Sequence, residues 1–464
     1  MSIPKNAEQN PITAQAPEPR LDIIRREEHC VSRRQISPNS LKILYRLNEA
    51  GFQAYIVGGG VRDLLLMQTP KDFDIATDAT PEEIKKIFGN ARIIGRRFKI
   101  VHIQFGREII EVSTFRAAPE NSVAIVGDSL ARKVTHLDSA HSENGMLLRD
   151  NVYGDIEGDV MRRDFTVNAL YYTVQNFAIH DYVQGMADIQ RRTLRMIGDP
   201  LQRYREDPVR VLRAIRLAAK LDFAIEKNTA APLQDCARLL ESIPPARLFD
   251  ECLKLFFAGQ AQKTYRLLKQ YGVFQILFPA TGELLDQNDE GTRVLLENAL
   301  ENTDSRIREG KSVTPAFLLA AILWPPLHKL FGQKLAAGTQ PLPAMHESAQ
   351  TIIMAQLERL SIPKRYSIPM REIWEYQLQL PRRSGKHAEI MLGHKRFRAA
   401  YDFLLLRESA GEDLQGLGQW WTDYQNASAP EREKMQAEQM KTRHNTRTRK
   451  RKRRVKSPGS HSEQ

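Results

Sequence analysis

A strand, three consecutive glycines and a helix start follow one another in QAYIVGGGVRDLLL, residues 53–66. Glycine permits the tight turn between the two elements, and the bare backbone of Gly58 and Gly59 can approach a ligand closely. The helix start directs its positive end to the same place, so a phosphate group suits this turn. GxGxxG spacing and the Walker lysine are both absent, which argues against a dinucleotide fold or a P-loop. A purely structural turn is the alternative.

Two aspartates stand two residues apart in the next predicted strand, KDFDIAT, residues 71–77. Successive side chains of a strand point to opposite faces, so Asp72 and Asp74 would share one face and Phe73 would face the core. Neighbouring carboxylates repel each other unless something positive lies between them, and a divalent cation is the usual solution. The pair therefore predicts a metal site, with two surface aspartates beside a turn as the alternative.

The spacing of apolar residues changes along the chain. Up to about residue 183, short apolar runs alternate with turn signals, and Gly106 separates two runs that predict a hairpin. From residue 203 onward, apolar residues recur at spacings of three and four, as in Leu212, Ile215 and Ala219, which is typical of helices. The sequence therefore predicts an α+β fold, with a mixed-sheet head followed by all-helical neck and body domains.

Local signals predict where several helices begin and end. Asn39 or Ser40 is the expected cap of a helix that starts LKILYRLNEA and ends at Gly51. Thr80 is the expected cap of TPEEIKKIF, with a proline at the first helical position. The stretch RYREDPVRVLRAIR, residues 203–216, predicts one helix.

Cysteine usage and hydropathy exclude several protein classes. Cys30, Cys236 and Cys252 lack CxxC spacing, which argues against a disulfide framework and against a cysteine-rich zinc site. The N-terminus lacks the apolar core of a signal peptide, and the longest apolar run, AFLLAAILW at 316–324, is about half a membrane span. We expect a cytoplasmic protein without a membrane span.

A third carboxylate, Glu111 in IIEVSTF, follows the predicted hairpin turn. Between two antiparallel neighbours it could join Asp72 and Asp74 on one face, and a solvent-facing edge residue is the alternative. Phosphoryl transfer from a nucleotide needs such carboxylates, because the Mg²⁺ they hold can activate a hydroxyl and neutralise the leaving pyrophosphate.

Two later segments combine arginine with carboxylates. In DVMRRDFTVNALYY, Arg163 precedes Asp164; a guanidinium suits phosphate oxygens, and the carboxylate can orient it or reach the metal. In RYREDPVRVLRAIR, Asp207 and Arg210 lie within one turn and could serve as acceptor and donor toward a base edge. Solvated surface ion pairs are the alternative for both segments.

Four motifs that follow one another within residues 40–225 together resemble those of a known nucleotidyltransferase class, which contains bacterial poly(A) polymerases and tRNA CCA-adding enzymes. The motifs are GGGVRD, DFD, RRDFTVNALYY and REDPVRVLRAIR. The resemblance implies a nucleotidyltransferase head that uses Mg²⁺. It implies that Asp72 and Asp74 are metal-binding catalytic carboxylates and that Asp164 is a further catalytic aspartate, while Glu111 occupies the place of the third metal carboxylate. The implied nucleotide-binding residues are Gly58, Gly59, Arg62, Asp63, Arg163, Asp207 and Arg210.

Within that class, IIGRRFKIVHI (93–103), EIIEVSTFRA and NGMLLRDNVYGDI resemble the poly(A) polymerase branch. That resemblance implies template-independent addition of AMP from ATP to RNA 3′ ends, with release of pyrophosphate, by two-metal catalysis. A tRNA CCA-adding enzyme and a non-catalytic RNA-binding scaffold are the alternatives. The expected partners are RNA 3′ ends, ATP and the RNA decay machinery, and the expected state is a monomer.

Much of the net charge of +12 lies in one tail, because residues 441–456 hold ten Lys and Arg and no acidic residue. Such a segment is expected to be disordered when free and to bind RNA phosphates, a solubilising appendage being the alternative.

Five parts are expected along the chain. They are a flexible extension (1–38), the head (39–183), a neck for nucleotide and RNA binding (184–258), an RNA-binding body (259–428) and the disordered basic tail (429–464). The RNA-binding candidates in the tail are Arg447, Arg449, Lys450, Arg451, Lys452, Arg453 and Arg454.

Overall fold

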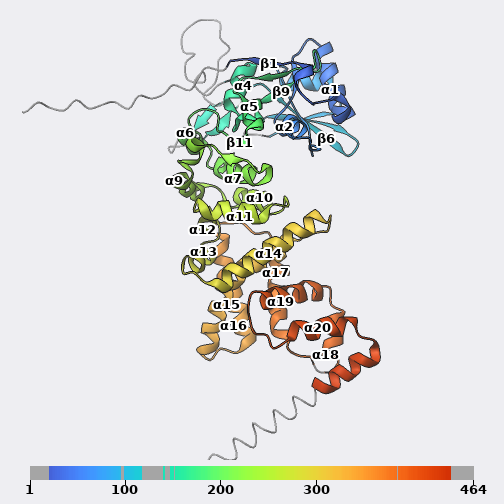
Figure 1. The fold of residues 1–464 in the computed structure, drawn as a ribbon, viewed down its shortest axis with the longest axis vertical. Coiled ribbons are helices and arrows are strands. Elements are labelled where there is room, and N and C mark those ends of the chain that lie inside the picture. Colours follow the sequence, from blue (N-terminus) through green and yellow to red (C-terminus); the bar gives the residue numbers. More distant parts are fainter. Residues whose placement is uncertain are drawn as a thin grey trace, which may run out of the picture. The chain divides into compact units, whose positions relative to one another are not determined.

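The computed structural model describes residues 20–95, 99–117, 139–141, 147–150, 152–383 and 385–439. The chain forms two compact units, Met1–Leu239 and Leu240–Gln464 (Figure 1). The division falls inside the segment expected to be the neck, and the finer division into neck and body stays a prediction.

The first unit contains a mixed sheet of eight strands in the order β1-β10-β9-β2-β3-β6-β5-β4. Neighbouring strands of this sheet are antiparallel except β3 and β6, which are parallel. The predicted mixed-sheet head is therefore confirmed. The strands are β1 (Asp22–Ile24), β2 (Ala54–Val57), β3 (Asp74–Thr77), β4 (Ala91–Ile94), β5 (Ile100–Phe105), β6 (Glu108–Thr114), β9 (Leu170–Tyr172) and β10 (Ile179–Asp181).

Buried strand β2 ends where Gly58 takes φ +70°, and α2 (Gly59–Leu65) starts at once. The predicted strand, glycine turn and helix are thus present. Strand β3 is shorter than expected, because its pairing with β2 stops at Asp74 opposite Val57 and the glycine turn removes any partner beyond. Asp72 consequently precedes the strand. Gly60 also lies close to a side chain, since a Cβ there would come within 3.1 Å of the Phe73 ring and the ring would have to shift.

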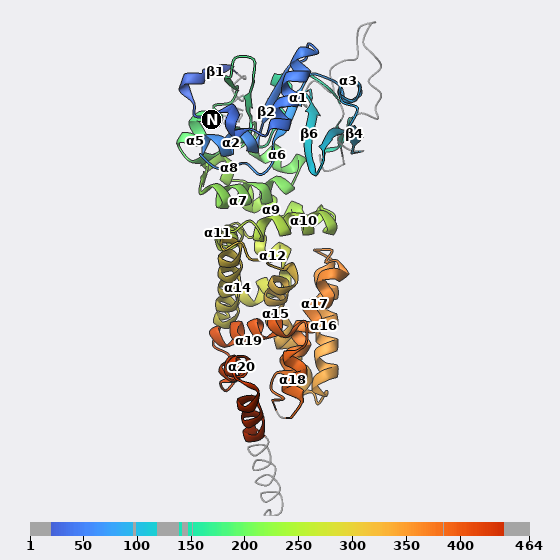
Figure 2. The same ribbon diagram turned by 90° about the vertical axis from the view of Figure 1, so that its right-hand side faces the viewer.

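Helices α1 (Pro38–Glu49) and α3 (Pro81–Ile87) pack on the sheet, α1 against β2 and β3 and α3 against β4 and β5 (Figure 2). Thr80 caps α3 as predicted, and its proline occupies the first turn. Helix α1 starts earlier than predicted, because Ser37 is its cap and the next residue is a proline suited to the first helical position. Gly51, at φ +87°, follows its end as expected.

The N-terminal boundary of the head differs from the prediction. Residues 22–24, within the extension expected to be flexible, form edge strand β1 and pair with β10. Val31 and Ile36 are buried. Apolar side chains in a polar stretch therefore tie residues 22–36 to the head, and residues 1–19 lie outside the described residues.

The predicted single helix at 203–216 is two helices, α6 (Pro200–Glu206) and α7 (Val209–Leu221). Asp207 between them is extended, with φ −144° and ψ 93°. Proline disfavours helical backbone in the residue before it, so Pro208 accounts for the break.

The first unit contains further short elements. Its other strands and α-helices are β7 (Ser139–His141), β8 (Leu147–Asp150), α4 (Ile156–Arg162), α5 (Gly185–Gln190), β11 (Thr193–Leu194), β12 (Ala224–Ile225), α8 (Lys227–Ala230) and α9 (Leu233–Ala237). Its 3₁₀ helices are η1 (Arg26–Glu28), η2 (Arg33–Gln35), η4 (Thr166–Asn168) and η5 (Arg238–Ser242), the last of which crosses into the second unit.

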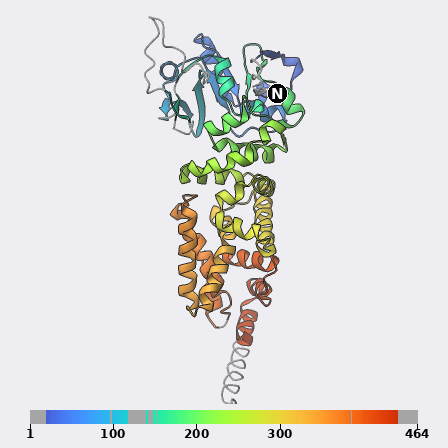
Figure 3. The ribbon, with the colours of Figure 1, turned by 90° about the vertical axis from the view of Figure 1, so that its left-hand side faces the viewer.

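The second unit is helical in its described part, as predicted (Figure 3). Helices α15, α16 and α17 pack against one another, and the Trp374 and Trp421 side chains are fully buried. These two tryptophans therefore belong to the core and not to an exposed RNA surface. The helices are α10 (Pro245–Phe256), α11 (Ala261–Gln270), α12 (Val273–Leu277), α13 (Pro279–Asp286), α14 (Glu290–Arg308), α15 (Pro315–Ala336), α16 (Pro341–Leu357), α17 (Lys364–Gln379), α18 (His387–Leu392), α19 (Phe397–Ser409) and α20 (Leu417–Asn426).

Cys30, Cys236 and Cys252 are all free. In the part of the chain that the structure describes, none of the helices combines the length and hydropathy needed to cross a bilayer.

Candidate active site

Asp74 opens β3 beside Val57, the last residue before the glycine turn. Ile75 pairs with Val112 in the parallel strand β6, so Asp74 and Glu111 stand at equivalent positions and leave the sheet on the same face. Asp74 is an exposed residue, yet the protein atoms around its carboxylate raise its pKa by desolvation, and the negative charge of Glu111 raises it further. The charge of Arg163 opposes this rise in pKa, and the charge of Asp72 adds to it. The charges of Glu111 and Asp72 therefore act on Asp74 at this edge of the turn.

Asp72 and Asp74 have the chemistry that a magnesium site needs, because Mg²⁺ prefers carboxylate oxygens. Among the described residues, no group of three His, Cys, Asp or Glu side chains is arranged to hold a metal ion. The expected third carboxylate, Glu111, is hydrogen-bonded to Nε2 of His102 at 3.2 Å. The donor set thus fits a site built on two aspartates, and the bond to His102 engages only Oε1 of Glu111.

Two guanidinium groups lie against the glycine turn. A Cβ on Gly58 would come within 3.6 Å of Nη1 of Arg163, and a Cβ on Gly59 within 3.4 Å of Nη2 of Arg62. Backbone N–H groups and guanidinium groups that converge in this way form a site for anions. The predicted phosphate-side residues are therefore brought together.

Arg62 and Asp63 are both buried and hold each other. Arg62 donates from Nε and Nη2 to Oδ1 of Asp63, at 2.8 and 2.6 Å, and from Nη1 to the side-chain oxygen of Asn168. Oδ2 of Asp63 accepts a hydrogen bond from Nζ of Lys220 at 3.2 Å. Both oxygens of Asp63 are therefore engaged by cations, and its contacts fix the direction of the Arg62 guanidinium.

Arg163 is held by a buried acid and a buried tyrosine that sequence reasoning missed. Its Nη2 donates to Oδ2 of Asp159 at 3.0 Å and its Nε to the Tyr171 hydroxyl at 2.6 Å, while that hydroxyl donates to Asp159 at 2.6 Å. Burial lowers the pKa of Arg163, but Tyr171 and Asp159 outweigh burial and raise it. The sequence carried one signal, since Asp159 precedes Arg163 by four residues.

Asp164 is buried, and its carboxylate is fully engaged. It accepts hydrogen bonds from the backbone N–H of Phe165 at 2.8 Å, Nδ2 of Asn168 at 3.1 Å and Nε of Arg213 at 2.7 Å. Burial would raise the pKa of Asp164, but Arg213 and Asn168 hold it well below its usual range. This aspartate is therefore ionised and fixed in place.

The residues expected to recognise the base lie at the junction of α6 and α7. Arg210 donates from Nη1 to Oε2 of Glu206 at 3.0 Å and to the backbone oxygen of Arg203 at 2.7 Å. Arg203 in turn donates to the backbone oxygens of Arg162 and Arg163, at 2.7 and 2.6 Å. Arg210 is thereby connected to the segment that carries Asp164, with Glu206 as its ion-pair partner, and Asp207 immediately precedes the proline break.

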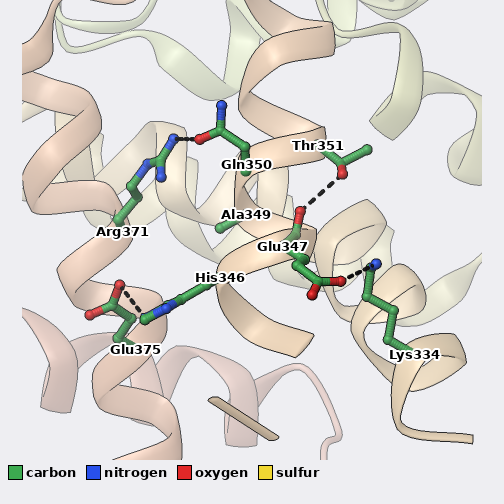
Figure 4. Close-up of a pocket in the computed structure, with 8 residues that line it drawn as sticks. All are labelled: Lys334, His346, Glu347, Ala349, Gln350, Thr351, Arg371 and Glu375. Carbon is green, nitrogen blue, oxygen red and sulfur yellow. Dashed lines mark hydrogen bonds and ion pairs between the residues drawn. The ribbon is translucent and has the colours of Figure 1, made fainter. Parts of the chain in front are cut away.

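A separate cavity of about 670 Å³ opens between α15, α16 and α17 in the second unit (Figure 4). Its charged residues are paired across it, Lys334 with Glu347 at 2.7 Å and His346 with Glu375 at 3.1 Å, and Arg371 donates to Gln350. No site residue predicted from the sequence lines it. The full lining is Lys334, His346, Glu347, Ala349, Gln350, Thr351, Arg371 and Glu375.

Comparison with known families covers most of the chain. Residues 54–195 match the poly A polymerase head domain, residues 222–285 the probable RNA and SrmB-binding site of polymerase A, and residues 337–456 the polymerase A arginine-rich C-terminus. Poly(A) polymerase I of Salmonella typhimurium is 47% identical over 422 residues, which is 90% of this chain and 88% of the relative. The chain belongs to the poly(A) polymerase family.

More distant relatives lie in the CCA-adding branch. The CCA-adding enzyme of Streptococcus sanguinis is 33% identical over 282 residues, covering 61% of this chain and 63% of that enzyme. The crystal structure of the Bacillus stearothermophilus CCA-adding enzyme in complex with CTP matches with a TM-score of 0.53 and 23% identity, over 84% of this chain and 82% of the other. Thermotoga maritima CCA-adding enzyme complexed with tRNA also gives a TM-score of 0.53, at 20% identity, over 85% of this chain and 84% of that one. These structures agree with the nucleotidyltransferase fold of this poly(A) polymerase family member.

Two predicted features lie outside the described residues. One is the arginine pair at 96 and 97, on which the choice of the poly(A) polymerase branch partly rests, and the other is residues 440–464 of the tail with all seven RNA-binding candidates. Residues 429–439, the first part of the tail predicted to be disordered, are instead helical, and Arg432 in this helix donates to the backbone oxygens of Tyr424 and Gln425. The arginine-rich family model nevertheless extends over residues 440–456 of that tail.

Proposed function

We propose that this protein is a polynucleotide adenylyltransferase that extends RNA 3′ ends with AMP from ATP, without a template, and releases pyrophosphate. The observation that carries this conclusion is the 47% identity to poly(A) polymerase I over 90% of the chain, against 33% over 61% for a CCA-adding enzyme. The alternative of a non-catalytic RNA-binding scaffold is disfavoured, because the carboxylates and arginines of the motifs are all present and a scaffold does not need them.

In the proposed reaction the RNA 3′-hydroxyl forms a bond to the α-phosphorus of ATP as the bond to the pyrophosphate oxygen breaks. The Gly58–Gly59 turn, with Arg62 and Arg163 against it, binds the triphosphate and fixes its direction. Asp72 and Asp74 would hold Mg²⁺, which when bound lowers the pKa of the attacking hydroxyl and neutralises the leaving group. The fixed, ionised Asp164 keeps Asn168 and the neighbouring Arg163 in place.

Recognition of adenine is assigned to Asp207 and Arg210. A site built to hydrogen-bond one base leaves buried polar groups unpaired with another, which is the physical basis for choosing ATP over CTP. The contacts of Arg210 with Glu206 and Arg203 support this assignment, because a pre-positioned guanidinium loses little freedom on binding. We also propose that the protein depends on Mg²⁺, is a monomer, is located in the cytoplasm and contacts the RNA decay machinery.

The deciding experiment incubates the purified protein with Mg²⁺, a 5′-labelled unstructured RNA and each nucleoside triphosphate in turn, with the products separated on a sequencing gel. A long ladder with ATP alone is expected. One or two additions, or use of CTP on a tRNA lacking its end, would favour the CCA-adding alternative. Bound RNA without any extension would favour the scaffold.

The basic tail is proposed to supply affinity for RNA without base recognition. If all ten basic residues between 441 and 456 met phosphates of single-stranded RNA, the slope of log K against log salt would be about −7. Deleting residues 441–464 should raise the KM for RNA and flatten its salt dependence, while the KM for ATP stays the same. Steady-state kinetics at several salt concentrations test this, and an unchanged slope would contradict it.

A further inference from the structure

Six side chains of the first unit form a chain of polar contacts that begins and ends on α7, so that the helix itself completes a polar ring. Lys220 contacts Asp63, Asp63 contacts Arg62, and Arg62 contacts Asn168. Asn168 contacts Asp164, and Asp164 contacts Arg213, which returns the ring to α7. The ring therefore joins three separate segments: the glycine turn with α2, the RRDFTVN segment and helix α7.

Helix α7 has the geometry to act as the fixed side of this ring. Arg213 and Lys220 are seven residues apart, which is two helical turns, so they project from the same side about 10 Å apart along the axis. The helix is anchored by buried apolar residues, among them Val211, Leu212, Ile215 and Leu217. Its two cations are thus presented at a fixed spacing to one carboxylate from each of the other two segments.

The ring touches the groups that face the nucleotide in two places. The Arg62 guanidinium lies against Gly59, and the backbone oxygen of Asn168 accepts a hydrogen bond from Nη1 of Arg163 at 3.4 Å. A displacement within the ring would therefore move both guanidinium groups that flank the glycine turn.

We propose that Lys220 is a positioning residue for adenylyl transfer, which acts through Asp63 to hold Arg62 in register with the glycine turn. This inference rests on the proposed function. Only about a tenth of the Asp63 side chain is exposed, and Oδ1 already accepts both N–H groups from Arg62. Without Lys220, Oδ2 loses this partner in a largely desolvated position, and the carboxylate turns to recover one. Arg62 turns with it and leaves Asn168.

The test is steady-state adenylate addition to RNA by Lys220→Met in the full-length protein. We expect kcat to fall about tenfold with the KM for ATP within about twofold of its original value, because the lost alignment matters most in the transition state. Lys220→Arg should recover most of the loss, since its guanidinium can reach the same oxygen. Lys220→Gln, which keeps a donor without the charge, should lie between the two and serves if the methionine variant folds poorly.

A double-mutant cycle separates positioning from simple destabilisation. Asp63→Asn with Lys220→Met should lower kcat no further than the more severe single variant, because both remove the same link. Lys334→Met is the matched control: it removes a lysine of comparable exposure from an ion pair of 2.7 Å in the second unit. Its kcat should stay within about twofold of the wild type.

Three outcomes would overturn the inference while the wild type still extends RNA with ATP. They are an unchanged kcat in Lys220→Met, an additive double variant, or an equal loss in Lys334→Met. A wild-type protein that adds no adenylate would instead refute the proposed function, so the two failures can be told apart.

Discussion

The ion pairs around the candidate active site of the first unit differ from those that line the cavity of the second unit. In the first unit, buried or half-buried pairs join segments that are distant in sequence, such as Arg213 with Asp164 and Lys220 with Asp63. In the second unit, the pairs that line the cavity join neighbouring helices through more exposed side chains, His346 and Glu375 being 53% and 35% exposed. A buried charge is costly unless it is paired and hydrogen-bonded, whereas an exposed pair costs and contributes little. Burial and long-range connection therefore characterise the ion pairs of the proposed active site, whereas the cavity of the second unit is lined by more exposed pairs.

The largest expected effect is that of Asp74→Asn. Loss of one carboxylate from the two-aspartate site should lower kcat by about 1,000-fold or more while the fold is retained. Asp78→Asn is the control, because Asp78 accepts a hydrogen bond from the backbone of Gln53 at 2.8 Å and an asparagine oxygen can still accept it. Adenylate incorporation and thermal unfolding are measured for both, and near-normal turnover in Asp74→Asn would refute the metal assignment.

Gly58→Ala should affect the site more than it affects stability. At φ +70° an alanine is strained by about 1–3 kcal/mol, and its Cβ would also contact the Arg163 guanidinium. Gly51→Ala is the control, because Gly51 has φ +87° and open space around it, so an alanine there is strained but its Cβ meets no neighbouring atom within 4 Å. We expect similar losses of unfolding free energy, but a fall in kcat/KM for ATP of about 100-fold in Gly58→Ala alone. Equal activity in the two variants would show that the turn does not hold the triphosphate.

Arg210→Ala should reduce the preference for ATP over CTP by about tenfold, because one donor to the base is lost. The control is Arg205→Ala, an exposed arginine on α6. The ratio of kcat/KM for the two nucleotides is the quantity to compare. If Arg210→Ala keeps the full preference, the base is recognised elsewhere.

The smallest effect is expected in the cavity of the second unit. Glu375→Gln removes the exposed pair with His346, so unfolding free energy should change by less than about 1 kcal/mol and turnover by less than about twofold. Chemical denaturation and the RNA extension assay measure the two quantities. A large loss of turnover would mean that the distinction between the units drawn above is wrong.

The sequence predicted the elements of the first unit better than it predicted their connections. Gly58, Gly106 and Thr80 marked turns and a cap correctly, because their effects are local. Strand β3 was predicted too long, since its first residue depends on where β2 ends, and the helix at 203–216 was predicted as continuous although Pro208 interrupts it. A proline also explains the difference at α1, because Pro38 favours the first helical turn and places the start of the helix before the predicted cap.

The candidate site shows the same division. Motif residues such as Asp74, Arg62 and Arg163 were identified because their types and spacing are informative. Their supports, including Tyr171 and Lys220, were missed because each lies on a separate element and only the fold brings it to its partner. Lys220 carried one faint signal, its position seven residues after Arg213 on a helix whose other faces are largely apolar.

The edge strand β1 has a consequence for how the protein is made. Asp22 pairs with Asp181, so strand β1 cannot pair with β10 until most of the first unit has left the ribosome. Contacts between residues distant in sequence slow folding. The polar ring forms later than the β1–β10 pair, because it also requires α7. A nascent chain shorter than about 220 residues therefore cannot have the complete proposed nucleotide site, and we expect adenylyl transfer only after the sheet and α7 have come together.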